Sequence, residues 1–308
     1  MAYLDRRDFL KTSVMAGAGA LLGTDPLRAA PTPLMSIAHY RSSPSDPAGV
    51  AEEARRLTRR AIEALGGMNR FVSKGNVVWV KPNISWDRRA EQAATTNPDV
   101  VAALVEMCYQ AGAKKVLVSD NSCNPSRLSF PRSGIQAAAE KAGAEVAFMD
   151  ERKFRKMSIK GKVLRDWEVY QDIVEADRLI NVPIAKNHNL CQATLGMKNL
   201  MGIIGGSRNR LHQDLGGTLV DLASFFKPQL VVLDAIRVLT ANGPVGGNLA
   251  DVKRKDTVVA GVDQVAVDAF GATLLGYKPE SISYIAQGNG RGLGTLNFNS
   301  LSPRRVEV

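Results

Sequence analysis

Apolar positions along this chain alternate between helical spacing and short continuous runs. From Pro47 to Leu65 they recur at helical intervals, and Gly66-Gly67 supplies a helix stop. Continuous apolar runs are typical of buried strands. They occur at residues 77–80, 115–120, 145–148, 178–183, 230–234 and 257–262. The stretch 163–170 has the pattern of an edge strand.

Capping signals place helices between these runs. Asn97-Pro98-Asp99 combines an N-cap residue, a proline at the first helical position and an acid near the positive end of the helix dipole. Further helices are predicted over 134–142 and from Asp263 to Gly276. The order predicts an α/β fold with a mostly parallel sheet and helices on both faces, and leaves open two lobes that share a crevice. Residues 288–308 are expected to form a loop and a loose tail.

The first thirty residues have the organisation of an export signal. Arg6-Arg7 precedes Phe9-Leu10-Lys11, and a small, apolar run follows over 12–23. This run is shorter than the roughly 20 residues that span a bilayer. The pattern predicts a twin-arginine signal peptide, with the translocase as a partner and a periplasmic or otherwise exported product. The cleavage site is poorly defined, so an uncleaved signal that anchors the protein in the membrane stays an alternative.

These features divide the chain into four expected parts. They are a signal peptide over 1–30, an N-terminal extension and helix over 31–75, an α/β domain over 76–295 and a basic tail over 296–308. The formal net charge of +10 favours anionic ligands, although a solvated surface is the simpler explanation of a diffuse excess. Aromatic residues make up only 6% and do not interleave with basic blocks, which argues against a nucleic-acid partner.

Cysteine content bounds the redox chemistry. Cys108, Cys123 and Cys191 show no C-x-x-C spacing and are too few for a cluster that needs four thiolates. An iron–sulfur cluster held within the chain is therefore disfavoured. Cys108 lies on the apolar face of a predicted helix and is expected in the core. A disulfide between Cys123 and Cys191 stays open in an oxidising compartment.

Polar side chains follow four of the predicted strands directly. In open parallel sheets the ligand crevice lies at the carboxyl ends of the strands. Each of these residues could instead close a turn or cap a loop, but their convergence on one sheet edge favours function. The residues concerned are Lys81, Asn83, Asp120, Asn121, Lys186, His188 and Asp234.

The densest polar segment runs from residue 186 to 202, with Arg208, Arg210 and His212 shortly after it. A buried core does not explain so many polar groups, because each desolvated Lys, Asn or His needs a partner. We therefore expect this segment to form loops that follow a strand and to supply much of the site.

Several motifs together resemble the family known as domain of unknown function 362. The resemblance covers roughly residues 76–295, and many relatives carry a ferredoxin-like segment with cluster-binding cysteines that is lacking here. It therefore implies neither a specific reaction nor redox activity for this chain. The motifs are Val80–Asn83, Thr96–Pro98, Ile180–Pro183, Lys186-x-His188, Gly196–Gly202, His212, Asn242–Pro244 and Asp263–Asp268.

The leading hypothesis is an enzyme of unknown reaction that acts on an anionic small molecule. Lys81, Lys186 and Lys198 are expected to bind carboxylate or phosphate, with His188 as general acid or base. The candidate catalytic residues are His188, Lys186 and Lys198. The candidate substrate-binding residues are Lys81, Asn83, Asp120, Asn121, Asn199, His212 and Asn242.

The alternative is a non-catalytic exported accessory protein that binds a metal, a cofactor or a redox partner. The sequence does not identify a cofactor, but nitrogen and oxygen ligands for a divalent metal are available. The candidate ligands are His188, His212, Asp120 and Asp234.

Overall fold

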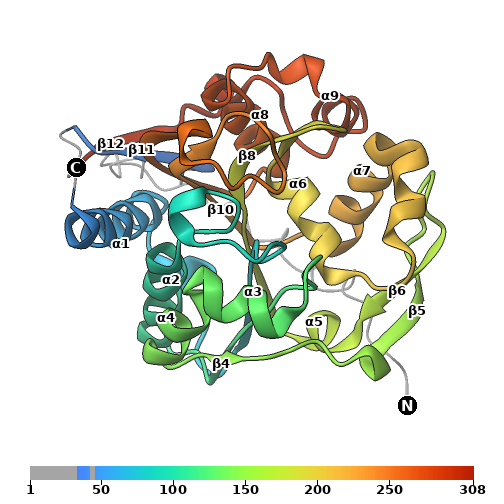
Figure 1. Ribbon diagram of the computed structural model, residues 1–308, viewed down its shortest axis with the longest axis horizontal. Coiled ribbons are helices and arrows are strands. Elements are labelled where there is room, and N and C mark those ends of the chain that lie inside the picture. The colour runs from blue at the N-terminus through green and yellow to red at the C-terminus, as the bar shows by residue number, and fades with distance from the viewer. Residues whose placement is uncertain (1–32, 42–45) are drawn as a thin grey trace, which may run out of the picture. The chain divides into compact units, whose positions relative to one another are not determined.

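The computed structural model describes residues 33–41 and 46–308 (Figure 1). The predicted signal peptide and its cleavage site lie outside the described residues. Within the described part of the chain, ten strands form one mixed sheet, in the order β12-β1-β11-β10-β7-β2-β3-β4, with β8 and β9 branching from β10. No helix in this part is both long and apolar enough to cross a bilayer.

The centre of the sheet is parallel, as the alternating pattern predicts. Parallel pairing joins β10, β7, β2, β3 and β4 in that order. These strands span Leu230–Leu239, Arg178–Val182, Val77–Pro82, Lys115–Val118 and Glu145–Val146. On the other side β11 (Val252–Gly261) runs antiparallel to β10 and to β1 (Met35–His39), which pairs in parallel with β12 (Arg304–Glu307).

Helices cover both faces of the sheet, which confirms the expected α/β architecture. One core lies beneath α1 (Pro47–Ala64), α2 (Pro98–Gln110), α3 (Ser126–Ser133) and α4 (Ile135–Lys141). The other lies beneath α5 (Gln171–Glu175), α6 (Gly196–Asn199), α7 (Leu215–Phe226), α8 (Gln264–Leu274) and α9 (Ser283–Gly290). Figure 1 shows α1, α2 and α4 together, away from α6 to α9.

The predicted helix starts are confirmed by their caps. The Asn97 side chain accepts a hydrogen bond from the backbone N–H of Asp99 at 2.9 Å, and α2 follows. Asp263 accepts one from Ala266 N–H at 2.9 Å, which begins α8. Each cap satisfies a backbone donor that the first helical turn leaves free. The local chemistry of the sequence is therefore sufficient to place these two elements.

Of the other local expectations, two are wrong, and the edge-like strand is confirmed. The segment 186–202, expected as loops, begins instead within strand β8 (Ile184–His188), which pairs with β10 and with β9 (Gln192–Thr194). Residues 304–307, expected in a loose tail, form β12. The edge-like stretch forms β6 (Asp166–Tyr170), whose partner β5 (Phe154–Ser158) was not predicted. Long-range pairing and burial overrode the local polarity of these segments.

The sheet divides at Pro183, and this positions the site. Up to Val182 strand β7 pairs with both β2 and β10, whereas after Pro183 the chain continues as β8, which still pairs with β10 but no longer with β2. The end of β2 and the whole of β8 therefore diverge. Crevices at the carboxyl ends of strands where the order changes are the usual ligand sites of open α/β sheets.

Candidate functional site

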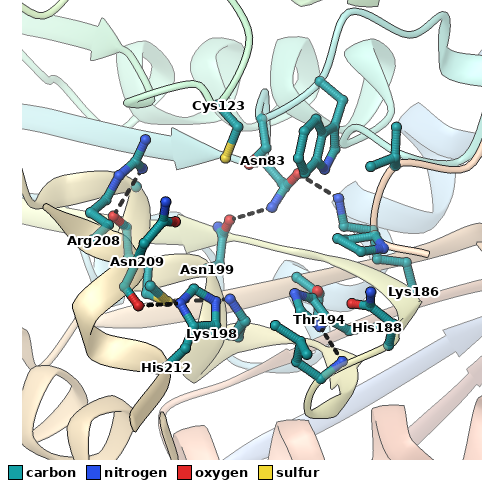
Figure 2. A pocket seen from close by; sticks show the side chains of 18 of the residues that line it. Asn83, Cys123, Lys186, His188, Thr194, Lys198, Asn199, Arg208, Asn209 and His212 are labelled. Atoms are coloured by element: carbon teal, nitrogen blue, oxygen red, sulfur yellow. Dashed lines mark hydrogen bonds between the residues drawn. The ribbon is translucent and has the colours of Figure 1, made fainter.

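A cavity of about 750 Å³ lies at this divergence (Figure 2). Its size is within the range of small-molecule sites. No Asp or Glu is among the described residues that line it. The polar and charged side chains on its wall include Asn83, Cys123, Lys186, His188, Thr194, Lys198, Asn199, Arg208, Asn209 and His212.

Lys186 is a buried amine on this wall, with 1% of its surface exposed. Its Nζ donates to the carbonyl of Ala94 at 2.6 Å and to Asn83 Oδ1 at 3.1 Å. Burial lowers the pKa of Lys186 to about 7, and the nearby positive charge of Lys198 acts in the same direction. An amine with two N–H groups engaged and a pKa near neutrality can take or give a proton at its remaining position.

Lys198 and Arg208 carry positive charge without an acidic partner in the described part of the chain. Lys198 is half-buried, and its Nζ contacts Met201 Sδ at 3.2 Å. Burial lowers the pKa of Lys198 as well. The Arg208 guanidinium donates to the carbonyls of Asn121 at 2.8 Å and Ser122 at 3.2 Å, which fixes it on the neighbouring loop. Both cations are therefore available to an anionic ligand.

His188 is held in one neutral form. Its Nδ1 accepts a hydrogen bond from the Leu190 backbone N–H at 3.1 Å, so the ring proton lies on Nε2. Burial lowers the pKa of His188 to about 3, with Lys198 and Lys186 acting in the same direction. A neutral ring whose remaining nitrogen is protonated donates a hydrogen bond but has no lone pair to accept a proton. This arrangement argues against the expected general acid–base role.

His212 has the opposite arrangement. Its Nδ1 lies 3.1 Å from the carbonyl oxygen of Asn209, which can only accept, so Nδ1 carries the proton. In the neutral ring Nε2 is then a hydrogen-bond acceptor. The cavity is thus lined by one histidine whose second nitrogen donates and one whose second nitrogen accepts.

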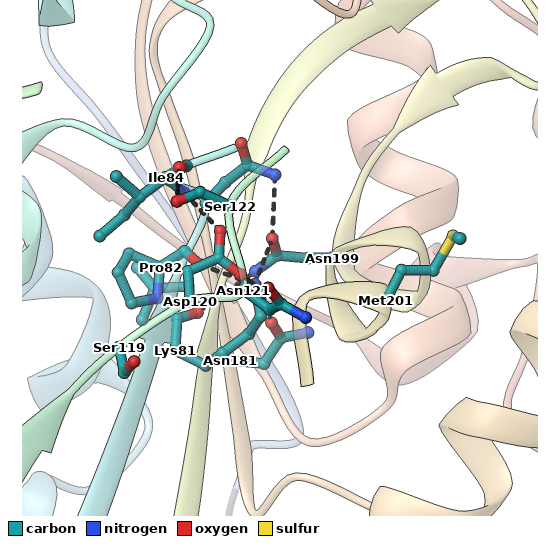
Figure 3. Close-up of polar contacts among 12 residues, drawn as sticks. Lys81, Pro82, Ile84, Ser119, Asp120, Asn121, Ser122, Asn181, Asn199 and Met201 are labelled. Carbon is teal, nitrogen blue, oxygen red and sulfur yellow. Dashed lines mark hydrogen bonds and ion pairs between the residues drawn. The ribbon is translucent and has the colours of Figure 1, made fainter. Parts of the chain in front are cut away.

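Lys81 and Asp120 are not among the residues that line the cavity, and Figure 3 shows them near Asn199, which does line it. They form an ion pair of 2.6 Å and are essentially inaccessible to solvent. Asp120 Oδ2 also accepts from the Ile84 backbone N–H at 2.6 Å. Burial lowers the pKa of Lys81, although Asp120 opposes this shift. The expected ligand contacts of this pair are therefore not supported, because each charge is already satisfied by the other.

A chain of amides connects this pair to the cavity. Lys81 Nζ donates to Asn199 Oδ1 at 3.0 Å, and Asn83 Nδ2 donates to the same oxygen at 3.0 Å. Asn199 Nδ2 in turn donates to Asn181 Oδ1 at 2.8 Å. In the sequence Asn181 stands out only as part of a motif. A lone amide within an apolar strand is the signal that could have identified it.

Three other predicted residues lie off the cavity wall. Asn121 donates to the Ile204 carbonyl, and exposed Asn242 donates to Asp251. Asp234 accepts from the backbone N–H groups of Asn97 and Ile236, and burial raises its pKa to about 6. Asp234 therefore acts as an internal cap, the structural alternative to a ligand-binding role.

The candidate metal ligands are not gathered into one set. In the residues that the structure describes, no group of three or more His, Cys, Asp or Glu side chains is placed to hold a metal ion. Cys123 and Cys191 are free thiols, so the disulfide that the sequence allowed between them is not formed. Cys123 instead lines the cavity.

Comparisons with known proteins agree with the motifs. Residues 78–273 match the model of the family "Domain of unknown function (DUF362)", and residues 4–23 match the signal sequence of the twin-arginine translocation pathway. The chain is 28% identical over 262 residues to the thylakoid-associated protein sll1697 of Synechocystis sp., covering 81% of this chain and 80% of that protein.

Among solved structures, the lactate racemase apoprotein of Thermoanaerobacterium thermosaccharolyticum aligns with a TM-score of 0.47 at 14% identity. The alignment covers 77% of this chain, which spans about 56% of the racemase.

Proposed function

We propose that this chain, which belongs to the DUF362 family and is exported through the twin-arginine route, is an enzyme that acts on an anionic small molecule. The observation that carries the proposal is the composition of the cavity wall. Lys186, Lys198 and Arg208 share one cavity whose described lining contains no carboxylate. Positive charge in a concave, partly desolvated site favours an anionic ligand over a neutral one.

Lys198 and Arg208 are the proposed anion-binding groups. Within the described chain, the hydrogen-bond acceptor of Lys198 is the sulfur of Met201, and thioether sulfur is a weak acceptor. A carboxylate or phosphate oxygen would be a stronger partner. Arg208 is already oriented by two backbone carbonyls, so little side-chain entropy is lost when a ligand binds.

Lys186 is the proposed proton-transfer group. Its pKa of about 7 allows both protonation states to be populated near neutral pH. The Nε2–H of His188 can donate to an oxygen on which negative charge develops. The Nε2 acceptor of His212 can hold a donor group of the ligand. Proton transfer at or beside the anionic group of a bound molecule is the reaction class that these roles support.

The test compares Lys198→Met with Lys156→Met, an exposed lysine on β5 that serves as a matched charge control. Calorimetry would measure the affinity of the purified protein for inorganic phosphate and for acetate. A hydrogen bond to a charged group contributes about 1.5–3 kcal/mol, so Lys198→Met should weaken binding by roughly 10- to 100-fold. Equal affinities in the two variants would contradict the proposed anion site.

A second candidate function is a non-catalytic role in holding a metal ion. The observation that favours it is the contact of His212 Nδ1 with the Asn209 carbonyl, which leaves Nε2 as the ring nitrogen that could ligate a metal. Elemental analysis of the natively exported protein would test it. Stoichiometric metal that is lost in His212→Ala would support it, and metal-free protein that binds phosphate would favour the enzyme.

A further inference from the structure

The wall of the cavity is not uniformly polar. Its lining includes five apolar residues: Trp86, Leu190, Met201, Pro244 and Val245. Leu190 is 66% exposed, the largest fraction among the exposed large hydrophobic residues of the described chain. A single exposed leucine is ordinary on a protein surface. Leu190 differs because it borders a cavity together with four other apolar residues.

Hydrogen bonds hold two of the apolar segments together. The backbone N–H of Gly243 donates to Asn187 Oδ1 at 3.1 Å, and the N–H of Asn189 donates to the Gly243 carbonyl at 3.3 Å. These bonds attach the segment that carries Pro244 and Val245 to the turn that carries Leu190. A Cβ on Gly243 would lie 1.9 Å from the Asn187 carbonyl oxygen, so this close approach requires glycine.

The loop that carries Trp86 is fixed in a similar way. The carbonyl of Ser85 accepts from the backbone N–H groups of Cys123 and Asn124 at 2.9 and 3.0 Å. The apolar side chains of the cavity therefore lie on segments fixed by backbone hydrogen bonds. Such segments can present a preformed apolar surface to a ligand.

Leu190 and Arg208 lie on different sides of the cavity. Figure 2 shows Arg208 and Asn209 on one side of the cavity and Lys186 and His188 on the other. Leu190 belongs to the His188 side, because its N–H donates to His188 Nδ1. The cavity thus has Arg208 on one side, and on the other side Leu190, which lies beside Lys186 and His188.

We propose that the natural ligand is an anion that bears an apolar chain or ring, with the anionic group at Lys198 and Arg208 and the apolar part against Leu190, Pro244 and Val245. This inference rests on the proposed function and narrows its substrate class. Water beside these apolar residues is displaced when the apolar part of the ligand binds, so the affinity for the ligand grows with the apolar surface that is buried. Each buried methylene is expected to strengthen binding by roughly fourfold.

The test uses straight-chain monocarboxylates from acetate to octanoate, with inorganic phosphate as a head-group probe. Calorimetry on the purified protein would give the dissociation constant of each. We expect affinity to rise by roughly fourfold per methylene over the first few carbons. In the double variant Leu190→Ser/Val245→Ser this rise should flatten, while the affinities for acetate and phosphate stay as in the wild type.

Leu128→Ser is the matched control, since Leu128 is also exposed (56%) but does not line the cavity. Its chain-length dependence should equal that of the wild type. The inference is overturned if affinity does not depend on chain length while acetate and phosphate still bind, or if the dependence persists in the double variant. Failure of the proposed function itself gives a different result, because the affinities for acetate and phosphate would then be the same in Lys198→Met as in the wild type.

Discussion

Lys81 on β2 and Lys186 on β8 are two buried lysines of one sheet, and they have opposite surroundings. Lys81 lies 2.6 Å from the carboxylate of Asp120, whereas Lys186 donates within the described chain to an amide oxygen and a backbone carbonyl. The first forms an ion pair outside the cavity lining, and the second lines the cavity. Lys81, which has a carboxylate partner, therefore has a structural role, whereas Lys186, which has none in the described chain, is free to take part in proton transfer.

Two asparagine side chains link the ammonium groups of Lys81 and Lys186 by hydrogen bonds, with no charged group between them. Asn199 Oδ1 accepts from Lys81, and Asn83 donates to that oxygen while accepting from Lys186 with its own Oδ1. Neutral dipoles thus position both ammonium groups, but Asp120 neutralises Lys81 alone. The comparison predicts that removing Asp120 damages the fold, and that removing Lys186 mainly alters the chemistry.

The largest expected effect comes from Asp120→Ala. This change leaves Lys81 buried without its counter-ion, which typically costs about 3–5 kcal/mol. Urea unfolding monitored by circular dichroism would measure the loss. The double variant Lys81→Met/Asp120→Ala should recover part of it, because the unpaired charge is then gone. A loss of less than about 1 kcal/mol in the single variant would show that the pair does not stabilise the fold.

Gly202→Ala tests the same pair by crowding it. An added Cβ would lie 1.8 Å from Asp120 Oδ1 and 2.6 Å from Lys81 Nζ, so the ion pair or the segment above it must move. Overpacking of this kind costs about 1–3 kcal/mol. Gly290→Ala is the control, since a Cβ added there would meet no atom of the described residues within 4 Å. Equal unfolding midpoints for the two variants would argue that the pair tolerates displacement.

The comparison also shows how far the sequence could predict this molecule. Caps and apolar runs were enough to place α2, α8 and the central strands, because those signals are local. They also indicated the sheet edge at which the cavity lies. They could not distinguish Lys81 from Lys186, because both follow the same local pattern and only the fold brings Asp120 to one of them. From the sequence alone, both lysines are therefore assigned to the ligand.

The histidines illustrate the same limit. Residue type alone makes His188 the expected acid or base. Its role depends on the backbone N–H of Leu190, which occupies Nδ1 in the turn between β8 and β9. Because the sequence predicts a loop at that turn and not a hairpin, it offers no basis for choosing the protonated nitrogen.

Lys186→Met should change the pH dependence of stability. The pKa of Lys186 is about 7 in the folded protein, below its ordinary value near 10.5, so between these values the unfolded chain binds more protons and stability rises with pH. Below pH 7 Lys186 is protonated in both the folded and the unfolded protein, so the full cost of burying its charge lowers the stability. The wild type should gain up to about 1.4 kcal/mol per pH unit above pH 7 relative to Lys186→Met.

Urea titrations from pH 6 to 9 would measure this difference, and comparison between variants cancels the contributions of other titrating groups. Lys156→Met should keep the slope of the wild type, because Lys156 is exposed. Parallel curves for the wild type and Lys186→Met would mean that Lys186 keeps an ordinary pKa and is not suited to proton transfer at neutral pH.

The smallest effect is spectroscopic and concerns the two cavity histidines. Nitrogen-15 NMR of the imidazole rings at pH 7 should show the proton of His188 on Nε2, because Leu190 N–H occupies Nδ1. His188 should stay neutral down to about pH 4, since burial lowers its pKa to about 3. In neutral His212 the proton should lie on Nδ1, bonded to the Asn209 carbonyl.

Assignment of the signals would use His188→Gln and His212→Gln, each of which removes one ring. If both rings carried the proton on the same nitrogen, the division into a donor and an acceptor would fail, while the anion site at Lys198 and Arg208 would remain to be judged by its own binding test.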